Sequence, residues 1–149
     1  MNSDSSLVSN RKAFHDYEIL ESFEAGIMLV GTEVKSLRAH GGSLQDAYVL
    51  VSGNTVTLKN SSITPYAHGG TAFNHEERRD RKLLLHKGEI EKLRRFSDEK
   101  GLTIIPLSMY LKEGTIKVKI AVARGKKSYD KRAALKEKES ERAIKRLLG

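Results

Sequence analysis

The hydrophobic positions of this chain alternate with polar ones in several segments, which predicts strands more often than helices. Residues 115–123 alternate apolar side chains with Lys117 and Lys119, as in an antiparallel strand with one buried and one open face. With residues 103–111 and the turn at 112–114, this segment predicts a hairpin. Residues 47–51 and 56–58 predict a second hairpin around a turn that contains Gly53.

Two further strands and two helices follow from the remaining pattern. Residues 15–23 predict a first strand, although Leu20 breaks its alternation, and the apolar run 27–30 predicts a buried one. A short helix capped by Thr32 has its apolar positions three apart and its cations on the other side. Residues 89–100 predict a second helix that ends at Gly101.

These elements predict a mainly β fold with helices, of the α+β class. Five or six antiparallel strands and two short helices suit a small antiparallel β-barrel, closed or partly open, of the oligonucleotide-binding type. Periodicity alone favours an α+β sandwich almost equally. We divide the chain into a disordered N-terminus at 1–9, a barrel domain at 10–123 and a basic C-terminal tail at 124–149.

Charge is concentrated in that tail. The whole chain of 149 residues carries a net charge of +8 and has a pI of about 9.7. Residues 124–149 hold ten Lys/Arg and four Asp/Glu, so they supply most of the excess. A basic chain of this size indicates a polyanionic partner, most often nucleic acid. Because the tail has a poor apolar stripe, we expect it to be disordered when free and helical on an anionic surface.

Motifs for metal, cofactor or catalytic chemistry are incomplete. The chain has no cysteine, and the pair His75-Glu76 lacks the second histidine of a zinc-protease motif, because Arg79 stands there. Residues 125–127 lack the upstream glycine and the hydroxyl of a phosphate-binding loop. No apolar stretch reaches membrane-spanning length. We therefore expect a cytoplasmic binding protein with no cofactor, no catalytic residue and no small-molecule substrate.

Basic side chains outside the tail fall into two groups. A single surface lysine or arginine usually does no more than interact with water, but a cluster can neutralise several phosphates. One group lies at residues 10–12 together with Lys35 and Arg38. The other, at the end of a long loop at 66–80 and just after it, is Arg78, Arg79, Arg81 and Lys82.

The motifs, taken in order, resemble one family. They are Glu24-Ala25-Gly26, Glu33-Val34-Lys35-Ser36-Leu37-Arg38, Tyr48-Val49-Leu50, Ile63-Thr64-Pro65, Arg81-Lys82-Leu83-Leu84-Leu85, and Gly125-Lys126-Lys127 through Asp130-Lys131-Arg132. This order is similar to that of the bacterial transfer-messenger-RNA-binding proteins, also called SsrA-binding proteins or small protein B. The resemblance extends from Asn10 to Arg146.

The resemblance implies a barrel that holds the tRNA-like domain of transfer-messenger RNA at its elbow. It also implies that the tail, helical when bound, reaches the decoding centre and mRNA channel of a stalled ribosome. Elongation factor Tu would then be met through the shared RNA. The expected RNA-binding residues are Asn10, Arg11, Lys12, Glu24, Lys35, Arg38, Arg81, Lys82, Leu84, His86, Lys117 and Lys119. The expected ribosome-binding residues are Arg124, Gly125, Lys126, Lys127, Tyr129, Asp130, Lys131, Arg132, Ile144, Leu147 and Leu148.

Three of these residues have a chemical argument of their own. Three consecutive leucines cannot all face one core, so at least one of 83–85 is exposed and Leu84 can lie under an unpaired base. Glu24 on a phosphate-binding face must accept hydrogen bonds from a base amine or an arginine, or else pair with a neighbouring lysine. His86 stands where many relatives have asparagine, and it keeps one donor and one acceptor.

The tail departs from the family pattern at two positions. Many relatives carry histidine where Tyr129 stands and tryptophan where Ser140 stands.

Two other functions remain open beside the delivery of transfer-messenger RNA to stalled ribosomes, which is called trans-translation. A general RNA-binding or ribosomal protein would share the charge and the barrel, and a nuclease would need a catalytic cluster.

Overall fold

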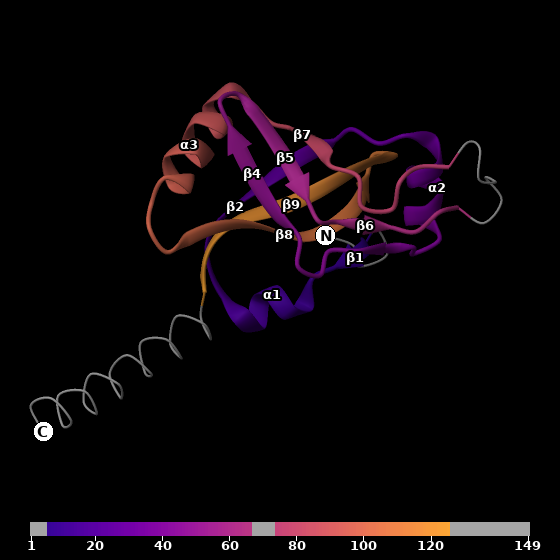
Figure 1. Ribbon diagram of the computed structural model, residues 1–149, viewed down its shortest axis with the longest axis horizontal. Coiled ribbons are helices and arrows are strands. Elements are labelled where there is room, and N and C mark those ends of the chain that lie inside the picture. The colour runs from indigo at the N-terminus through magenta and orange to yellow at the C-terminus, as the bar shows by residue number, and fades with distance from the viewer. Residues whose placement is uncertain (1–5, 67–73, 126–149) are drawn as a thin grey trace, which may run out of the picture.

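The computed structural model describes residues 6–66 and 74–125, which form a curved antiparallel sheet with three helices (Figure 1). The long strands β2 (Tyr17–Ile27), β8 (Leu102–Lys112) and β9 (Thr115–Gly125) form its centre. The other elements in chain order are β1 (Ser6–Ser9), α1 (Arg11–Asp16), α2 (Gly31–Arg38), β3 (Gly42–Ser43), β4 (Tyr48–Ser52), β5 (Thr55–Lys59), β6 (Ser62–Ile63), β7 (Arg81–Leu84) and α3 (Lys87–Ser97).

Seven strands are hydrogen-bonded in the order β1-β8-β9-β2-β7-β5-β4, and each neighbouring pair is antiparallel. Within the described ranges β1 and β4 are edges, so hydrogen bonds do not close the sheet. The sheet curls enough for β4 to contact β8 across the interior. The mainly β fold with helices is confirmed, and the barrel is the partly open form. A third helix, α1, adds to the two that were predicted.

Both predicted hairpins are confirmed. β4 pairs with β5 around Gly53, and β8 pairs with β9 from Lys112↔Thr115 onwards. The loop of the second hairpin is Glu113-Gly114, with φ values of 52° and 77°. Two positive φ values match the right-handed twist of the flanking strands, which is why such short loops favour glycine.

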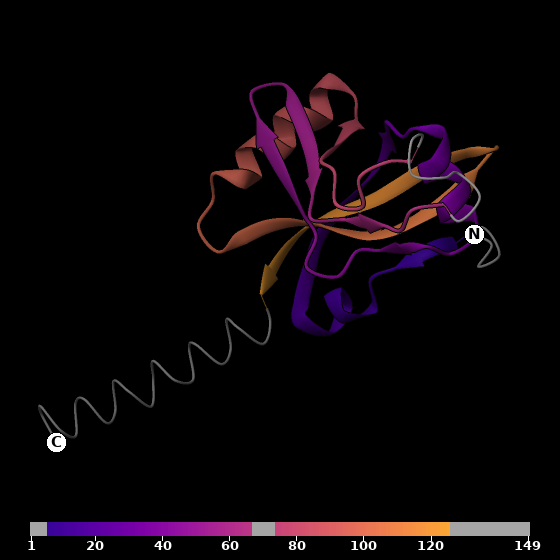
Figure 2. The same cartoon turned by 45° about the vertical axis from the view of Figure 1, so that its right-hand side comes forward.

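The central strands have two faces that differ in character. Phe23 and Ala25 of β2 and Val118 and Ile120 of β9 point into the main core. The opposite, outer face carries a second and smaller apolar cluster, in which Ala13 of α1 packs on Ile105, Leu107, Ala121 and Ala123. Helix α1 therefore covers one half of the outer face and leaves the other half bare. Helix α3 lies on the other side of the sheet, beside β4 and β5 (Figures 1 and 2).

A bulge in β2 lets one strand serve both clusters. Ile19 pairs with Ala123 and Glu21 with Val122, so Leu20 is an extra residue in the ladder. Before the bulge, Tyr17 and Ile19 face the outer cluster, and after it Phe23 and Ala25 face the main core. Side chains of a regular strand alternate between its two faces, so without the extra residue all odd-numbered residues would lie on one face. The break in alternation at Leu20 is therefore this bulge.

The expected disorder of residues 1–9 is wrong for Ser6–Ser9, which forms β1; residues 1–5 lie outside the described part. β1 pairs with β8, and Val8 is buried. The first strand also begins at Tyr17 and not at His15, because α1 occupies residues 11–16. Asn10 anchors this helix, since its amide Nδ2 donates to the Pro106 carbonyl at 2.8 Å. Tertiary contacts with β8 thus override weak local signals.

The buried strand expected at residues 27–30 is wrong beyond Ile27. Met28 and Val30 are exposed, and the chain turns there into α2. The helix is capped by Val30 and not by Thr32, so it begins at Gly31, two residues earlier than predicted, and the Glu33 carboxylate accepts the Val30 N–H at 2.9 Å. The predicted faces of the helix are confirmed, with Leu37 buried and Arg38 exposed.

A buried carboxylate joins α2 to β7 and to the loop before β7. Glu33 and Arg81 are both 0% exposed, and Arg81 Nη2 lies 2.7 Å from Glu33 Oε2. Arg79, 34% exposed at its side chain, reaches Glu33 Oε1 at 2.7 Å. Arg81 also donates to the carbonyls of Ser61, Glu76 and Glu77 at 3.0 to 3.2 Å. Every N–H group of this buried guanidinium therefore has an acceptor nearby.

The hydrogen bonds to Glu33 keep it ionised. Burial alone raises the pKa of its carboxyl, but hydrogen bonds from Arg79, the Val30 N–H and Arg81 outweigh burial and hold the pKa below its ordinary value of 4.5. Burial lowers the pKa of Arg81, while Glu33 opposes this decrease. We call Glu33, Arg79 and Arg81 the buried ion cluster.

Glu33→Gln is expected to lower the free energy of unfolding at pH 7 by about 3 to 5 kcal/mol, because it leaves the buried Arg81 charge without its counter-ion. The folded-state pKa of Glu33 lies below the unfolded value, so its contribution is present above 4.5 and is lost as pH falls through the folded pKa. The difference between wild type and variant should therefore shrink in acid. Urea unfolding at pH 7 and at a series of acidic pH values measures it.

Lys59→Ala is the matched control. It breaks a pair at the surface, Lys59 Nζ to Asp80 Oδ2 at 2.8 Å, and should lower the free energy of unfolding far less than Glu33→Gln does, because water screens the pair. Equal unfolding midpoints for Glu33→Gln and Lys59→Ala would contradict a structural role for the buried ion cluster.

Candidate nucleic-acid-binding surface

The bare half of the outer face brings together residues that are distant in sequence. In the register of the sheet, Glu24 of β2 is opposite Lys119 of β9. Gly26 is opposite Lys117 on one side and Leu84 of β7 on the other. Four of the residues predicted to bind RNA therefore lie in adjacent positions on three neighbouring strands. We call this arrangement the strand row.

A hollow of about 300 Å³ opens beside the strand row. Its lining includes Glu24, Leu84, His86 and Lys117, and the N-terminal part of α3 borders it. Leu84 is 50% exposed, which confirms the prediction that one of three consecutive leucines faces solvent. A Cβ on Gly26 would lie 3.3 Å from the Leu84 Cβ, so the missing side chain lets Leu84 approach β2 closely.

Glu24 is held in place by two donors from β8. Tyr110 donates its hydroxyl to Glu24 Oε2 at 2.5 Å, and Lys112 Nζ lies 3.0 Å from Oε1. The hydrogen bond from Tyr110, followed by that from Lys112, lowers the pKa of Glu24 below its ordinary value. Burial and the bond to Glu24 raise the pKa of Tyr110. The pair is therefore a carboxylate with a protonated phenol, and Glu24 offers a fixed acceptor among cations.

Glu24 was expected to meet either an RNA donor or a neighbouring lysine, and the structure places Lys112 against it. The two alternatives are compatible, because the Glu24 side chain is still 39% exposed. A partly exposed acceptor can take a further hydrogen bond from a base amine.

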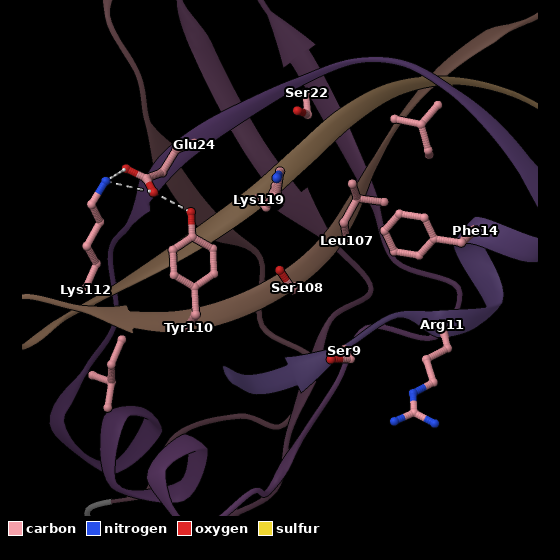
Figure 3. A pocket seen from close by; sticks show the side chains of 12 residues that line it. Ser9, Arg11, Phe14, Ser22, Glu24, Leu107, Ser108, Tyr110, Lys112 and Lys119 are labelled. Carbon is pink, nitrogen blue, oxygen red and sulfur yellow. Dashed lines mark hydrogen bonds and ion pairs between the residues drawn. The ribbon is translucent and has the colours of Figure 1, made fainter. Parts of the chain in front are cut away.

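A longer groove lies on the other side of Glu24 (Figure 3). It has a volume of about 590 Å³ and runs between α1 and β8. Arg11 and Lys119, both predicted to bind RNA, line it. Glu24 lines the groove as well as the hollow, so the two depressions share a wall.

Arg81 is the clear error among the predicted RNA contacts. It is fully buried in the ion cluster and cannot touch a ligand. Its neighbour Lys82 does point outward on β7, because consecutive residues of a strand alternate between faces. Arg81 therefore supports the surface from behind, while Lys82 and Leu84 form part of it.

The other predicted residues are scattered. Asn10 is half-buried and uses its amide to anchor α1, while Lys12 borders a different hollow, next to Asp16 and Tyr17. Lys35 and Arg38 lie on the exposed side of α2, where Lys35 Nζ is 5.7 Å from the centre of the Tyr66 ring. None of these four side chains lines the hollow or belongs to the strand row, as far as the described residues show.

Two of the predicted tail residues are described. Arg124 Nη1 lies 3.7 Å from Glu18 Oε1, and Gly125 ends β9. The remaining predicted ribosome contacts, from Lys126 to Leu148, lie outside the described residues, so the expected disorder of the free tail and its helix formation on binding stay predictions.

Sequence reasoning missed Tyr110, Lys112 and Phe14. The first two share the outward face of β8 with Ser108, and continuing the alternation of that strand would have found them. Phe14 gives no such signal, since the helix α1 was not predicted. It is 56% exposed and lines the groove.

The described residues also bear on metal binding and on membrane insertion. Among residues 6–66 and 74–125, no group of three or more His, Cys, Asp or Glu side chains is placed to hold a metal ion. None of the helices described is long and apolar enough to cross a membrane.

Comparison with known proteins agrees with the motif order. The family model described as "SmpB protein" matches residues 7–149. The SsrA-binding protein of Protochlamydia amoebophila is 58% identical over 97% of this chain and 94% of its own length. That of Chlamydia muridarum is 59% identical over 93% and 91%. That of Acidothermus cellulolyticus is 53% identical over 96% and 89%.

A solved structure shares the fold as well. It is described as "tmRNA-SmpB: a journey to the center of the bacterial ribosome", and its matching chain is 49% identical, with a TM-score of 0.68. The match covers 79% of the present chain and 82% of the other.

Lys117→Ala and Lys119→Ala are each expected to make RNA binding less dependent on salt. Each substitution removes one charge that can neutralise a phosphate, so the slope of log affinity against log salt should fall in magnitude by about 0.7 to 0.9. Fluorescence anisotropy with a labelled, folded RNA over a series of KCl concentrations measures this slope.

Lys100→Ala is the control for charge alone. Lys100 is exposed and precedes β8 at the end opposite to Lys112, so its loss should leave the slope unchanged. If all three variants keep the wild-type slope, the strand row does not contact phosphates.

Proposed function

The chain belongs to the SmpB protein family, and on that premise we propose that it binds the tRNA-like domain of transfer-messenger RNA and delivers it to stalled ribosomes. The support is twofold. Relatives at more than half identity over nearly the whole chain are SsrA-binding proteins. The strand row also places Glu24, Leu84, Lys117 and Lys119 on one exposed face. That clustering is the observation that carries the proposal.

The chemistry of this face suits recognition of a folded RNA better than non-specific binding to any polyanion. The body, residues 1–123, has a net charge of only +2, so few phosphate contacts are available for non-specific affinity. Specificity then depends on groups that read shape and unpaired bases. Leu84 offers an apolar contact for a base, and His86 beside it offers a ring face, a donor and an acceptor. Glu24 offers a fixed acceptor.

Glu24 acts in this proposal as a discriminating group. A carboxylate repels phosphates, so it favours RNA placements in which a base amine meets it and disfavours placements in which the backbone does. Tyr110 and Lys112 orient the carboxylate before RNA arrives, which lowers the entropy lost on binding. The buried ion cluster positions β7 behind the face.

The basic tail has a separate role in the proposal. Residues 124–149 carry most of the net charge. They begin at the C-terminal end of β9, whereas Lys117 lies near its N-terminal end. The tail is proposed to enter the decoding centre and mRNA channel, where small-subunit rRNA supplies the anionic surface. Elongation factor Tu would be reached through the shared RNA. The proposed role is binding and delivery in the cytoplasm, without turnover of a substrate.

The proposal predicts a preference for tRNA-like shape. Wild-type protein should bind a transcript of the tRNA-like domain at least about tenfold more tightly than an RNA hairpin of equal length at equal salt, a difference of about 1.4 kcal/mol. Glu24→Gln keeps the shape of the side chain but removes its charge. It should lower the ratio of the two affinities by about 5-fold or more, until the protein no longer prefers the tRNA-like domain. Anisotropy titrations measure both affinities.

Glu18→Gln on the same strand is the matched control and should bind like wild type, since Glu18 lies at the other end of β2, opposite Arg124. The melting temperatures of both variants should equal that of wild type, because both side chains are on the surface. A general RNA-binding protein would bind the two RNAs equally, and that result would refute the proposal.

The proposed division between body and tail makes its own prediction. A variant that ends at Gly125 should keep its preference for the tRNA-like domain, because the strand row and the hollow are intact. It should lose the ability to support peptide tagging on stalled ribosomes in a reconstituted translation assay. A truncated variant that loses RNA binding but still supports tagging would reverse the assignment.

A further inference from the structure

The groove between α1 and β8 has the chemistry of a stacking site. Phe14 of α1 stands at one end and Tyr110 of β8 at the other, with Leu107 between them against the Phe14 ring (Figure 3). Phe14 is 56% exposed, more than any other large hydrophobic side chain in the described ranges. Phe14 shares the groove with the apolar side chains of Ile19 and Leu107, so the exposed ring belongs to a contiguous apolar strip that a partner can cover.

The polar groups around this apolar strip match a nucleotide. Arg11 and Lys119 supply positive charge at the rim, and the hydroxyls of Ser9, Ser22 and Ser108 line the groove. A volume of about 590 Å³ lies within the range of small-ligand sites. Unpaired RNA bases stack on aromatic rings, hydrogen-bond at their edges and carry a phosphate on each side.

We propose that this groove receives an unpaired base of the same tRNA-like domain, stacked on Phe14, with a flanking phosphate near Arg11 and Lys119. This inference rests on the proposed function. Continuity supports it, because Glu24 lines both the groove and the hollow beside Leu84, so one RNA can occupy both. The surface would then hold RNA on the two sides of one carboxylate.

Charge favours RNA over the other possible occupants. Residues 126–149 are themselves cationic, with nine Lys/Arg and four Asp/Glu, and a second copy of the chain brings a net charge of +8. Either would place like charge beside Arg11, Lys112 and Lys119. An RNA nucleotide brings the opposite charge on its phosphate, whereas like charges at an interface act against binding.

Phe14→Ala should weaken binding of the tRNA-like transcript by about 5- to 150-fold, the range for loss of one base–aromatic stack. Phe14→Tyr and Phe14→Trp should bind like wild type because they keep a ring face. Phe14→Leu should bind like Phe14→Ala, since it is apolar but cannot stack. Leu50→Ala, which truncates an exposed side chain on β4, is the control and should have no effect.

The salt dependence separates stacking from charge. Phe14→Ala should lower the affinity at every KCl concentration with the same slope as wild type, because phenylalanine neutralises no phosphate. Equal affinities for wild type and Phe14→Ala, or full activity of Phe14→Leu, would overturn the inference. If wild type itself lacks preference for the tRNA-like domain, the proposed function fails first and the inference fails with it.

The occupant can be identified in the full-length chain by photo-cross-linking. A benzophenone-bearing phenylalanine at position 14, irradiated with the transcript present, should attach to an unpaired nucleotide. Attachment to residues 126–149 or to a second copy, with the RNA bound, would overturn the inference.

Discussion

A single buried carboxylate holds together the parts of this fold that carry the candidate RNA-binding surface. Glu33 accepts hydrogen bonds from Arg79 and Arg81, and it also fixes the first turn of α2 through the Val30 N–H. A carboxylate and a guanidinium without access to water are tolerated only when their partners are complete, and here they are. The same bonds fix β7, whose exposed residues Lys82 and Leu84 belong to the candidate RNA-binding surface. The chemistry at the surface therefore depends on electrostatics beneath it.

The outer face of the sheet shows how one short helix divides a surface by function. Where α1 packs, alanines and isoleucines form a second small core, and where it ends, lysines and Glu24 are left open. The candidate binding residues of the strand row thus lie on three paired strands, which position them more rigidly than loops would. Glu24 gains further order from Tyr110 and Lys112, so the face needs little rearrangement to bind.

Sequence patterns predicted what depends on neighbours along the chain. Alternation identified both hairpins, and three consecutive leucines predicted that one of them is exposed, which in the structure is Leu84. Two of the errors involve distant contacts. Arg81 looks like a surface arginine because its partner Glu33 lies 48 residues earlier, and β1 exists only through pairing with β8 about a hundred residues later. Periodicity carries no record of such partners, so burial of a charge cannot be read from it.

The extra residue at Leu20 shifts the phase of β2 by one position. Its odd-numbered residues line the small outer cluster before this point and the main core after it, so one strand belongs to two hydrophobic layers. An alignment that left out this extra residue would assign the core-facing and outward-facing side chains of half of the strand to the wrong faces. The alignment of any relative must therefore preserve the distance from Tyr17 to Glu24, or the acceptor would point into the core.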